Sequence, residues 1–246
     1  MTPMKRSHPR RHWWRAAMEV FLPAQCLLCD ETPSPSYNDQ LCEHCGGAWL
    51  PLPEGCARCG KPGADHAPLC SMCRDTPPPY RSAGALGIYE DPLAALIKRL
   101  KYHGAHALAP VLADAMADRI RTRLRPQPDM IVTPVPLHWL REAARGYNQA
   151  RLLSQGIAEK LKLSHQNLLR RRKPSKAQAR LGRVARRDNL SRAFEPNPKA
   201  RRHIEGAAIL LIDDVMTTGT TAAACSAALM SAGAASIDVF VCARAP

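Results

Sequence analysis

The chain has 246 residues, 46% of them hydrophobic, which indicates a folded protein with one medium and one small domain and excludes wholesale disorder. Its 35 Lys and Arg residues outnumber its 21 Asp and Glu residues, giving a net charge of +14. No run approaches the ~20 consecutive apolar residues of a membrane-spanning helix, so we expect no membrane span. Residues 1–22 form a basic arm without the apolar core of a secretory signal, and we expect a cytoplasmic protein.

Cysteines define the first domain that we expect, residues 23–76. Eight of the ten cysteines fall in four Cys-x-x-Cys pairs with 12, 10 and 10 residues between them: Cys26/Cys29, Cys42/Cys45, Cys56/Cys59 and Cys70/Cys73. A two-residue spacer lets both thiolates of a pair bind one metal ion, and two pairs complete a tetrahedral zinc site. We therefore predict one or two structural Zn²⁺ ions. Sequential pairing gives two zinc ribbons with short loops and is favoured, and interleaved pairing is the alternative.

The setting of these cysteines favours metal over disulfides. A reducing compartment is expected, and bound metal would supply the free energy that this apolar-poor region lacks. Gly46 and Gly60 each follow the second cysteine of a pair, where a tight turn needs positive φ or room for an approaching backbone. Cys225 and Cys242, outside the array, are expected to be small core residues.

A proline run at residues 77–79 leads into the second domain that we expect, residues 80–246, in which strands and helices alternate. The apolar patterns predict strands at residues 82–89, 130–132, 167–170, 206–212 and 237–243, and helices at residues 92–102, 107–124, 147–161 and 222–231. This alternation predicts an α/β fold, in which a parallel sheet is flanked by helices and ligands bind at the carboxyl ends of the strands.

The segment from residue 209 to residue 221 carries the most chemistry. Four apolar residues predict a buried strand, Asp213 and Asp214 follow at its end, and a Thr/Gly turn then opens an Ala-rich helix. Free backbone N–H groups and the helix dipole make such a turn a phosphate cradle. Two acids beside a phosphate cradle suit a ribose 5-phosphate, with its hydroxyls on Asp213 and Asp214.

This segment resembles the phosphoribosyl pyrophosphate (PRPP) loop of the type I phosphoribosyltransferases at all thirteen positions by residue class. The soft departure is Thr220, where many members carry Gly or Ser. The resemblance implies that Asp213 and Asp214 are the catalytic acids. It implies that the phosphate is bound by Val215, Met216, Thr217, Thr218, Gly219, Thr220 and Thr221.

Further segments, in the same order along the chain, resemble the ComF family of competence proteins, which includes the GntX-type proteins. They are residues 96–104, 132–137, 145–149, 178–181 and 186–194, and the cysteine array resembles the double zinc ribbon of that family. The resemblance implies a type I phosphoribosyltransferase-like parallel sheet flanked by helices, preceded by four-cysteine zinc ribbons.

The same resemblance assigns a pyrophosphate site and a lid. Pyrophosphate would contact the loop Thr133, Pro134, Val135 and Pro136 together with Lys101, Arg141 and Arg145, of which Arg145 is the best candidate. Residues 173–189 would form a mobile basic lid. Mg²⁺ would be held mostly by oxygens of PRPP and water, with few protein ligands.

The basic charge is concentrated at residues 141–202, which hold 18 Lys and Arg against 4 Asp and Glu. Such a field attracts polyanions. The favoured hypothesis is a ComF-like protein that binds PRPP or ribose 5-phosphate with Mg²⁺ and handles incoming single-stranded DNA, with a helicase-like competence ATPase as partner. If it is an enzyme, it transfers the phosphoribosyl group, to an acceptor that the sequence leaves open. The alternatives are a non-catalytic nucleic-acid-binding or regulatory adaptor on the same fold, and a nucleobase salvage phosphoribosyltransferase.

Overall fold

The computed structural model describes residues 25–29, 31–63, 68–102, 104–172 and 193–245. The chain divides into two compact units, Met1–Ala48 and Trp49–Pro246. The arm expected at residues 1–22 and the lid expected at residues 173–189 lie outside the described residues. Within the described ranges, no helix combines the length and apolar character needed to cross a membrane.

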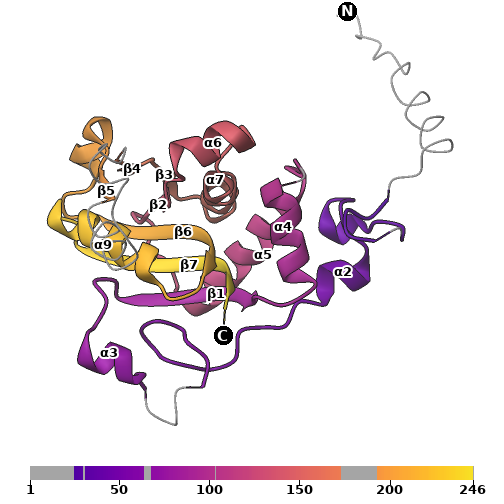
Figure 1. Cartoon of the computed structure of the whole chain (residues 1–246), viewed down its shortest axis with the longest axis horizontal. Coiled ribbons are helices and arrows are strands. Elements are labelled where there is room, and N and C mark those ends of the chain that lie inside the picture. Colours follow the sequence, from indigo (N-terminus) through magenta and orange to yellow (C-terminus); the bar gives the residue numbers. More distant parts are fainter. Residues whose placement is uncertain (1–24, 30, 64–67, 103, 173–192, 246) are drawn as a thin grey trace, which may run out of the picture. The chain divides into compact units, whose positions relative to one another are not determined.

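A five-stranded parallel sheet forms the centre of the second unit (Figure 1). Its strands lie in the order β1-β7-β6-β2-β3 and comprise β1 Ser82–Ile88, β2 Ile131–Pro134, β3 Ser164–His165, β6 Ala208–Met216 and β7 Ser236–Arg244. The central strands β6 and β7 are nearly continuous apolar runs because both of their faces are covered. The predicted parallel α/β sheet is thus confirmed.

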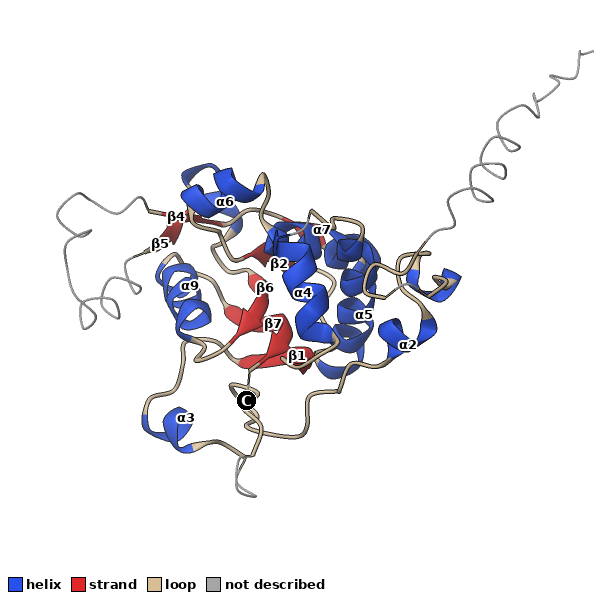
Figure 2. Cartoon of the chain, turned by 45° about the vertical axis from the view of Figure 1, so that its right-hand side comes forward, coloured by secondary structure: helices blue, strands red, loops and turns tan. Residues whose placement is uncertain are grey.

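Helices cover both faces of this sheet (Figure 2). On one face lie α4 Leu93–Tyr102, α5 Leu108–Arg123 and α7 Gln149–Leu161, and on the other lies α9 Thr220–Ser231. In α4 the spacing of the buried residues Leu93, Leu96, Ile97 and Leu100 places them on one face of the helix, toward the core. In α9, Cys225 is fully buried, as is Cys242 in β7, which confirms their predicted place in the core.

Short elements complete the two units. The first unit contains η1 Pro35–Tyr37 and α2 Glu43–Gly47. The second also contains α3 Ser71–Asp75, α6 Trp139–Arg145, β4 Leu169–Arg171, β5 Phe194–Pro196 and η3 Pro198–His203. The strand expected at residues 167–170 forms as β4, but it pairs antiparallel with β5 outside the main sheet. Helix α6 was not predicted from the sequence.

The strand before the Thr/Gly turn is longer than predicted. We expected it to end at Ile212, with the two acids beyond it, but β6 continues to Met216 and Asp213 pairs in register with Val241 of β7. The helix after the turn also begins earlier, at Thr220. Asp213 and Asp214 are therefore strand residues whose directions are fixed by the pleat of the sheet.

The second half of the cysteine array belongs to the same compact unit as the sheet. Arg58 donates hydrogen bonds to the carbonyl oxygens of Pro78 and Tyr80, at 3.0 and 3.2 Å. Pro51 forms an isolated bridge with Gly87 of β1. The loop that carries the second pair of Cys-x-x-Cys motifs is therefore anchored on the first strand of the sheet.

Candidate functional site

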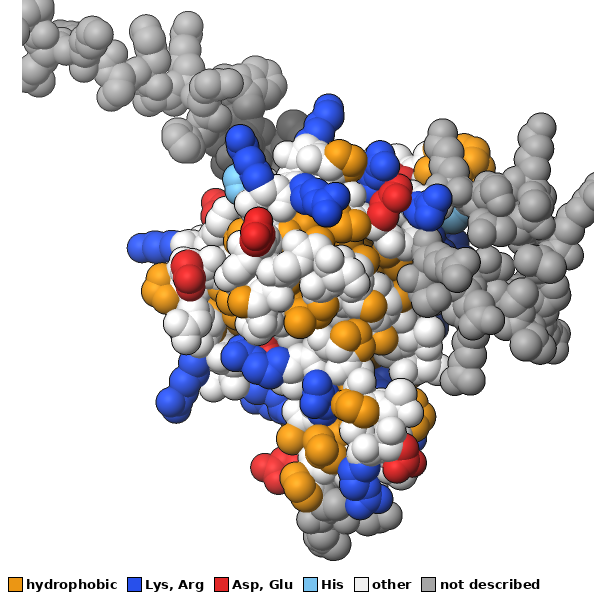
Figure 3. Space-filling view, turned by 90° about the vertical axis from the view of Figure 1, so that its left-hand side faces the viewer, with side chains coloured by type: hydrophobic (Ala, Val, Ile, Leu, Met, Phe, Trp, Pro, Cys, Tyr) orange, Lys and Arg blue, Asp and Glu red, His pale blue; other side chains and the backbone are white. Residues whose placement is uncertain are grey.

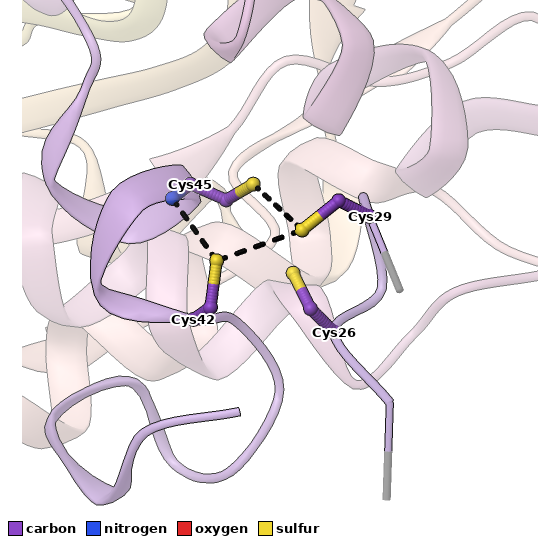
Figure 4. A group of neighbouring side chains, drawn as sticks. All are labelled: Cys26, Cys29, Cys42 and Cys45. Carbon is purple, nitrogen blue, oxygen red and sulfur yellow. Dashed lines mark hydrogen bonds between the residues drawn. The ribbon is translucent and has the colours of Figure 1, made fainter. Parts of the chain in front are cut away.

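The structure brings the eight cysteines together as two groups of four, each made of two successive pairs. Cys26, Cys29, Cys42 and Cys45 form the first group (Figure 4). Cys56, Cys59, Cys70 and Cys73 form the second. Within each group all sulfur atoms lie within 4.8 Å of one another. The favoured sequential pairing is confirmed, because neither group mixes alternate pairs.

The spacing of the sulfurs fits zinc. Sγ of Cys29 lies 3.6 Å from Sγ of Cys42 and 3.5 Å from Sγ of Cys45. In the second group, Sγ of Cys59 and Cys70 are 3.7 Å apart. Four thiolates at the usual Zn–S distance in a tetrahedron have sulfurs about 3.8 Å apart. Both groups could therefore hold a structural Zn²⁺ ion.

In each group, the surroundings lower the pKa of one thiol and raise the pKa of another. Burial raises the pKa of Cys26, but backbone amides that donate to its sulfur outweigh this and lower its pKa to about 7. Burial likewise raises the pKa of Cys56, and backbone amides that donate to its sulfur outweigh this and lower the pKa to about 6. Burial and neighbouring sulfurs instead raise the pKa of Cys45 and of Cys73 well above its usual value. A bound cation would remove this conflict, as thiolate–metal sites do.

Of the two glycines behind the cysteine pairs, Gly60 has the role that was predicted. Its φ is 65°, and a Cβ there would lie 2.8 Å from the backbone carbonyl oxygen of Ala83. Gly46 instead lies within α2, and a Cβ there would lie 2.5 Å from the ring of Tyr37. The space at Gly46 is therefore limited by a side chain and not by an approaching backbone.

The β6–α9 loop, residues 217–219, is a cradle of free donors. Gly219 has a φ of 77° and is the N-cap residue of α9, where it provides no side-chain hydrogen bond to the first turn. The amides of Thr217, Thr218 and Gly219 donate to no other residue that the structure describes. The hydroxyls of Thr218 and Thr220 lie 2.8 Å apart. These donors meet at a helix N-terminus, where an anion is favoured.

Asp213 lies beside this loop. Its side chain borders the same small hollow as residues 215–222 and Val241. Burial, and then the negative charge of Asp214, raise the pKa of Asp213 to about 8. Its Oδ1 accepts a hydrogen bond from the amide of Asp214, at 2.8 Å. A ligand that brings hydroxyl groups or a cation would stabilise its charged form.

Asp214 lies on the opposite face of the sheet, under α4 and α7. It is buried and forms an ion pair with Lys101 of α4, with Oδ1 2.9 Å from Nζ. The side-chain amide of Gln149, the first residue of α7, donates a hydrogen bond to its Oδ2. The side-chain Oε1 of Gln149 accepts a hydrogen bond from Nη1 of Arg145 at 2.9 Å. Asp214 is therefore linked to both cations rather than to the loop.

The segment of residues 145–149 builds this link. Arg145 ends α6 and its guanidinium lies 4.8 Å from the centre of the Tyr102 ring. Gly146 turns the chain with a φ of 79°. Asn148 caps α7 through the amide of Ala150 and donates to the carbonyl oxygen of Val135, at 3.0 Å. Residues 145–149 were identified from the sequence as part of the family resemblance, but no role was predicted for Gln149.

The loop expected to bind pyrophosphate is largely built into the sheet. Thr133 is fully buried, and its Oγ1 accepts a hydrogen bond from the amide of Leu168 at 3.1 Å. Pro134 pairs with Ile212, and the amide of Val135 donates to the carbonyl oxygen of Ile212 at 2.8 Å. Only Pro136 is partly exposed. Arg141 is exposed on α6 and is not drawn into the Asp214 network.

Arg244, at the end of β7, also supports the loop and was not singled out from the sequence. Its side chain is 5% exposed, and Nη1 donates to the carbonyl oxygens of Met216 and Thr217. The available signal was a cation at the end of a strand whose preceding five residues, from Val239 to Ala243, are apolar. Arg244 fixes the start of the loop whose amides are free.

A parallel sheet flanked by helices, with a strand–loop–helix cradle and two four-cysteine groups, defines a phosphoribosyltransferase-like α/β protein. The chain is 33% identical to Competence protein F of Haemophilus influenzae over 233 residues. This match covers 93% of this chain and 100% of that protein. It is 30% identical to DNA utilization protein YhgH of Salmonella typhi, covering 91% and 98% of the two chains. It is 26% identical to Competence protein ComFC of Bacillus subtilis, covering 89% and 94%. The chain belongs to the ComF family of competence and DNA-utilization proteins.

No family model matches the chain. Its solved structural neighbours include a glutamine PRPP amidotransferase from B. subtilis, at 16% identity and a TM-score of 0.37, covering 55% of this chain and 26% of that one. They also include the allosteric regulatory enzyme of purine biosynthesis, at 18% identity and a TM-score of 0.35, covering 53% and 25%.

Proposed function

We propose that this protein binds ribose 5-phosphate or PRPP, with Mg²⁺, in the β6–α9 loop. The observation that supports this most is the meeting of three free amides, of Thr217, Thr218 and Gly219, with Asp213 in one hollow. The amides suit the 5-phosphate, and Asp213 suits the ribose hydroxyls or Mg²⁺. Mg²⁺ commonly uses one or two carboxylates together with phosphate oxygens, and Asp213 fits that need.

The other charged groups suit a second anionic group. Asp214 and Gln149 position Lys101 and Arg145. We propose that these two cations bind the pyrophosphate of PRPP. If the protein is an enzyme, pyrophosphate leaves the anomeric carbon as an acceptor attacks it. Positioning of the ribose and neutralisation of the leaving charge would then be the contribution of these residues.

Calorimetric titration of the zinc-loaded full chain tests this site. Ribose 5-phosphate and PRPP, each with and without Mg²⁺, are titrated into the wild type, Asp213→Asn, Asp214→Asn and Asp118→Asn. Asp118 lies on α5 with its side chain 63% exposed and serves as the matched control. We expect Asp213→Asn to weaken both ligands at least tenfold, about 1.4 kcal/mol, and the control to bind normally. Identical binding by Asp213→Asn and the wild type would refute the proposal.

We further propose that the protein acts in the cytoplasm on incoming single-stranded DNA, together with a helicase-like ATPase. The family and the basic stretch at residues 141–202 support this. Part of that charge is already paired within the fold, since Arg170 and Arg172 contact Glu195, at 2.9 and 3.7 Å. DNA binding should therefore draw on the remaining cations and fall as salt rises. Affinity that does not change between low and moderate salt would argue against this role.

A non-catalytic adaptor that binds nucleic acid is the second candidate function, favoured by the same basic stretch. Pyrophosphate release from PRPP, assayed with nucleobases and with single-stranded DNA as acceptors, separates the two. Release that Asp213→Asn abolishes supports the transferase. Binding of DNA by both the wild type and Asp213→Asn, without any release of pyrophosphate, supports the adaptor.

A further inference from the structure

The second four-cysteine group and the β6–α9 loop belong to the same compact unit, and both border one cavity of about 620 Å³. Cys59, Cys70 and Cys73 contribute to its lining from the cysteine group, and residues 217–220 contribute from the loop. Figure 3 shows the lobe that carries α3, with hydrophobic side chains at its surface, below the body that holds the sheet. A metal site beside the loop can influence it only through contacts that link the two.

Tyr80 provides such a contact. It is 3% exposed and belongs to the buried cluster that also contains Met216 and Ala222, against which Cys59 packs. Its hydroxyl lies 3.4 Å from the position that a Cβ on Gly219 would take. Gly219 is the N-cap residue of α9 and supplies one of the three loop amides that donate to no other described residue. The ring therefore reaches from beside the cysteines to the residue that shapes the cradle.

The turn of residues 56–59, which carries one pair of cysteines, holds Tyr80 in place. Arg58, within this turn, donates a hydrogen bond from Nη2 to the carbonyl oxygen of Pro78 at 3.0 Å and from Nε to that of Tyr80 at 3.2 Å. These bonds fix the backbone on both sides of Pro79. A Zn²⁺ ion bound by both thiolates of the turn would order it, because metal binding and local folding are coupled. The position of Tyr80 therefore depends on the order of the cysteine turn.

The charges around the phenol agree with a place between the two sites. Burial, and then the nearby charges of Cys59 and Cys73, raise the pKa of Tyr80, whereas the charge of Arg244 opposes this rise. The phenol is therefore neutral at ordinary pH and contacts the loop by packing. Arg244 is the side chain that supports the start of the loop, so Tyr80 lies within reach of both the cysteines and the cradle.

We propose that Tyr80 is a positioning residue that couples Zn²⁺ at the second four-cysteine group to an anion at the β6–α9 loop. Zn²⁺ orders the turn that holds Tyr80, and the ring then sets Gly219. Such coupling is reciprocal, so a bound phosphate strengthens zinc binding by the same factor as zinc strengthens phosphate binding. The ligand side of this coupling rests on the proposed function, whereas the contact through Tyr80 does not. The first four-cysteine group belongs to the other compact unit and serves as an internal control.

Amide hydrogen exchange in the zinc-loaded full chain tests the contact without any ligand. The amides of Ala223 and Ala245 donate to the carbonyl oxygens of Gly219 and Met216, each at 2.9 Å, and therefore report on the two ends of the loop. Arg58→Met removes both hydrogen bonds to the segment that carries Tyr80. We expect it to speed exchange of both amides about tenfold, because local opening becomes less costly.

Three further variants complete the exchange experiment. Arg74→Met is the matched control, since Arg74 also lies beside a cysteine of this group, but its side chain is exposed and makes no hydrogen bond or ion pair with any residue that the structure describes. It should change neither rate. Tyr80→Leu should act like Arg58→Met. Tyr80→Phe keeps the ring and should restore the rates of the wild type, so equal rates in Tyr80→Phe and Tyr80→Leu would overturn the role of packing.

Reciprocal binding tests the coupling itself. Cys45→Ser should keep Zn²⁺ only in the second group, and Cys73→Ser only in the first. Competition with a chelator measures the zinc dissociation constant of each variant with and without saturating ribose 5-phosphate. We expect ribose 5-phosphate to tighten zinc binding about tenfold in Cys45→Ser and to leave it unchanged in Cys73→Ser. Adding Arg58→Met to Cys45→Ser should reduce this effect to less than about threefold.

Failure of this inference and failure of the proposed function give different results. Unchanged exchange in both Arg58→Met and Tyr80→Leu would overturn the inference, and so would equal effects of ribose 5-phosphate on the two zinc groups in a protein that binds it. Faster exchange in these variants but not in Arg74→Met, in a protein that does not bind ribose 5-phosphate, would support the contact and reject the proposed function. Arg58→Met keeps the test valid if Tyr80→Leu does not fold, because Arg58 is not part of the buried core.

Discussion

Asp213 and Asp214 are neighbours in β6, yet their carboxylates lie on opposite faces of the sheet. Asp213 borders the hollow at the start of α9, whereas Asp214 contacts Lys101 of α4 and Gln149 of α7. Alternation along a strand makes this separation unavoidable. The two acids expected to grip one ribose therefore have different surroundings, and their substitution should have different effects.

Asp213 should reduce the stability of the protein progressively as the pH rises from about 4 to about 8. Its pKa is raised to about 8 in the folded chain, against 3.8 for a free side chain, so folding retains a proton that the unfolded chain releases between about pH 4 and pH 8. The free energy of unfolding therefore falls across this window. We therefore expect the difference in the free energy of unfolding between Asp213→Asn and the wild type to shift in favour of the variant from pH 4 to pH 8. Because the side chain is partly exposed, this shift should be only about 2–3 kcal/mol.

Urea unfolding at pH 5 and pH 8 measures this gain. Asp118→Asn is the control, because that exposed aspartate takes part in a surface pair with Arg121 that contributes little. A pH dependence of stability that is the same in Asp213→Asn and in the wild type would contradict the expected cost of ionising Asp213.

Arg145 and Arg141 should differ in their effect on PRPP. Arg145 is held by Gln149 beside the ring of Tyr102, whereas Arg141 is exposed on α6. We expect Arg145→Met to weaken PRPP about tenfold and to leave ribose 5-phosphate, which lacks pyrophosphate, unchanged. Arg141→Met should have a smaller effect on PRPP. Calorimetric titration of both ligands measures this. A larger loss of PRPP affinity in Arg141→Met than in Arg145→Met would show that Arg145 is not the main pyrophosphate ligand.

The two four-cysteine groups should be separable by mutation. Metal analysis of the wild type should give two Zn²⁺ per chain, and Cys45→Ser and Cys73→Ser should each give one. Cys73 belongs to the compact unit that holds the sheet and borders the cavity beside the β6–α9 loop. Cys73→Ser should therefore also weaken ribose 5-phosphate binding, whereas Cys45→Ser should not. Equal losses of binding would mean that both groups support the loop.

Asp238 should be important for stability rather than for binding. It is fully buried in β7, and accepts hydrogen bonds from Nε of Arg81, at 3.1 Å, and from Ser82, at 2.8 Å. Asp238→Ala leaves Ser82 without its acceptor, whereas the Arg81 side chain is 60% exposed and can be hydrated, so the free energy of unfolding should fall by about 1–2 kcal/mol. Denaturant titration measures the loss, with Asp118→Asn expected to lose less than about 0.5 kcal/mol. Comparable losses in the two variants would disprove the role of Asp238.

Features set by residues close in the chain were predicted well. The two-residue spacers placed each cysteine pair in one four-cysteine group, and the apolar runs located the flanking helices and every strand of the sheet except β3, which has two residues. The β6 strand was nonetheless predicted too short, because aspartates weaken the local apolar pattern while pairing with β7 extends the strand to Met216. Strand β4 was found, but its partner lies beyond residue 192, and local sequence does not specify that pairing.

The sequence by itself determined the cysteine pairs, the strand–loop–helix cradle and the family, since each depends on residue type and on short spacing. Only the tertiary structure decided that Asp213 faces the loop while Asp214 binds Gln149, 65 residues away. The same is true of the cavity that residues 59–80 and 217–245 enclose. Such contacts depend on which strands pair and which faces are covered, and those choices follow from the packing of the whole unit.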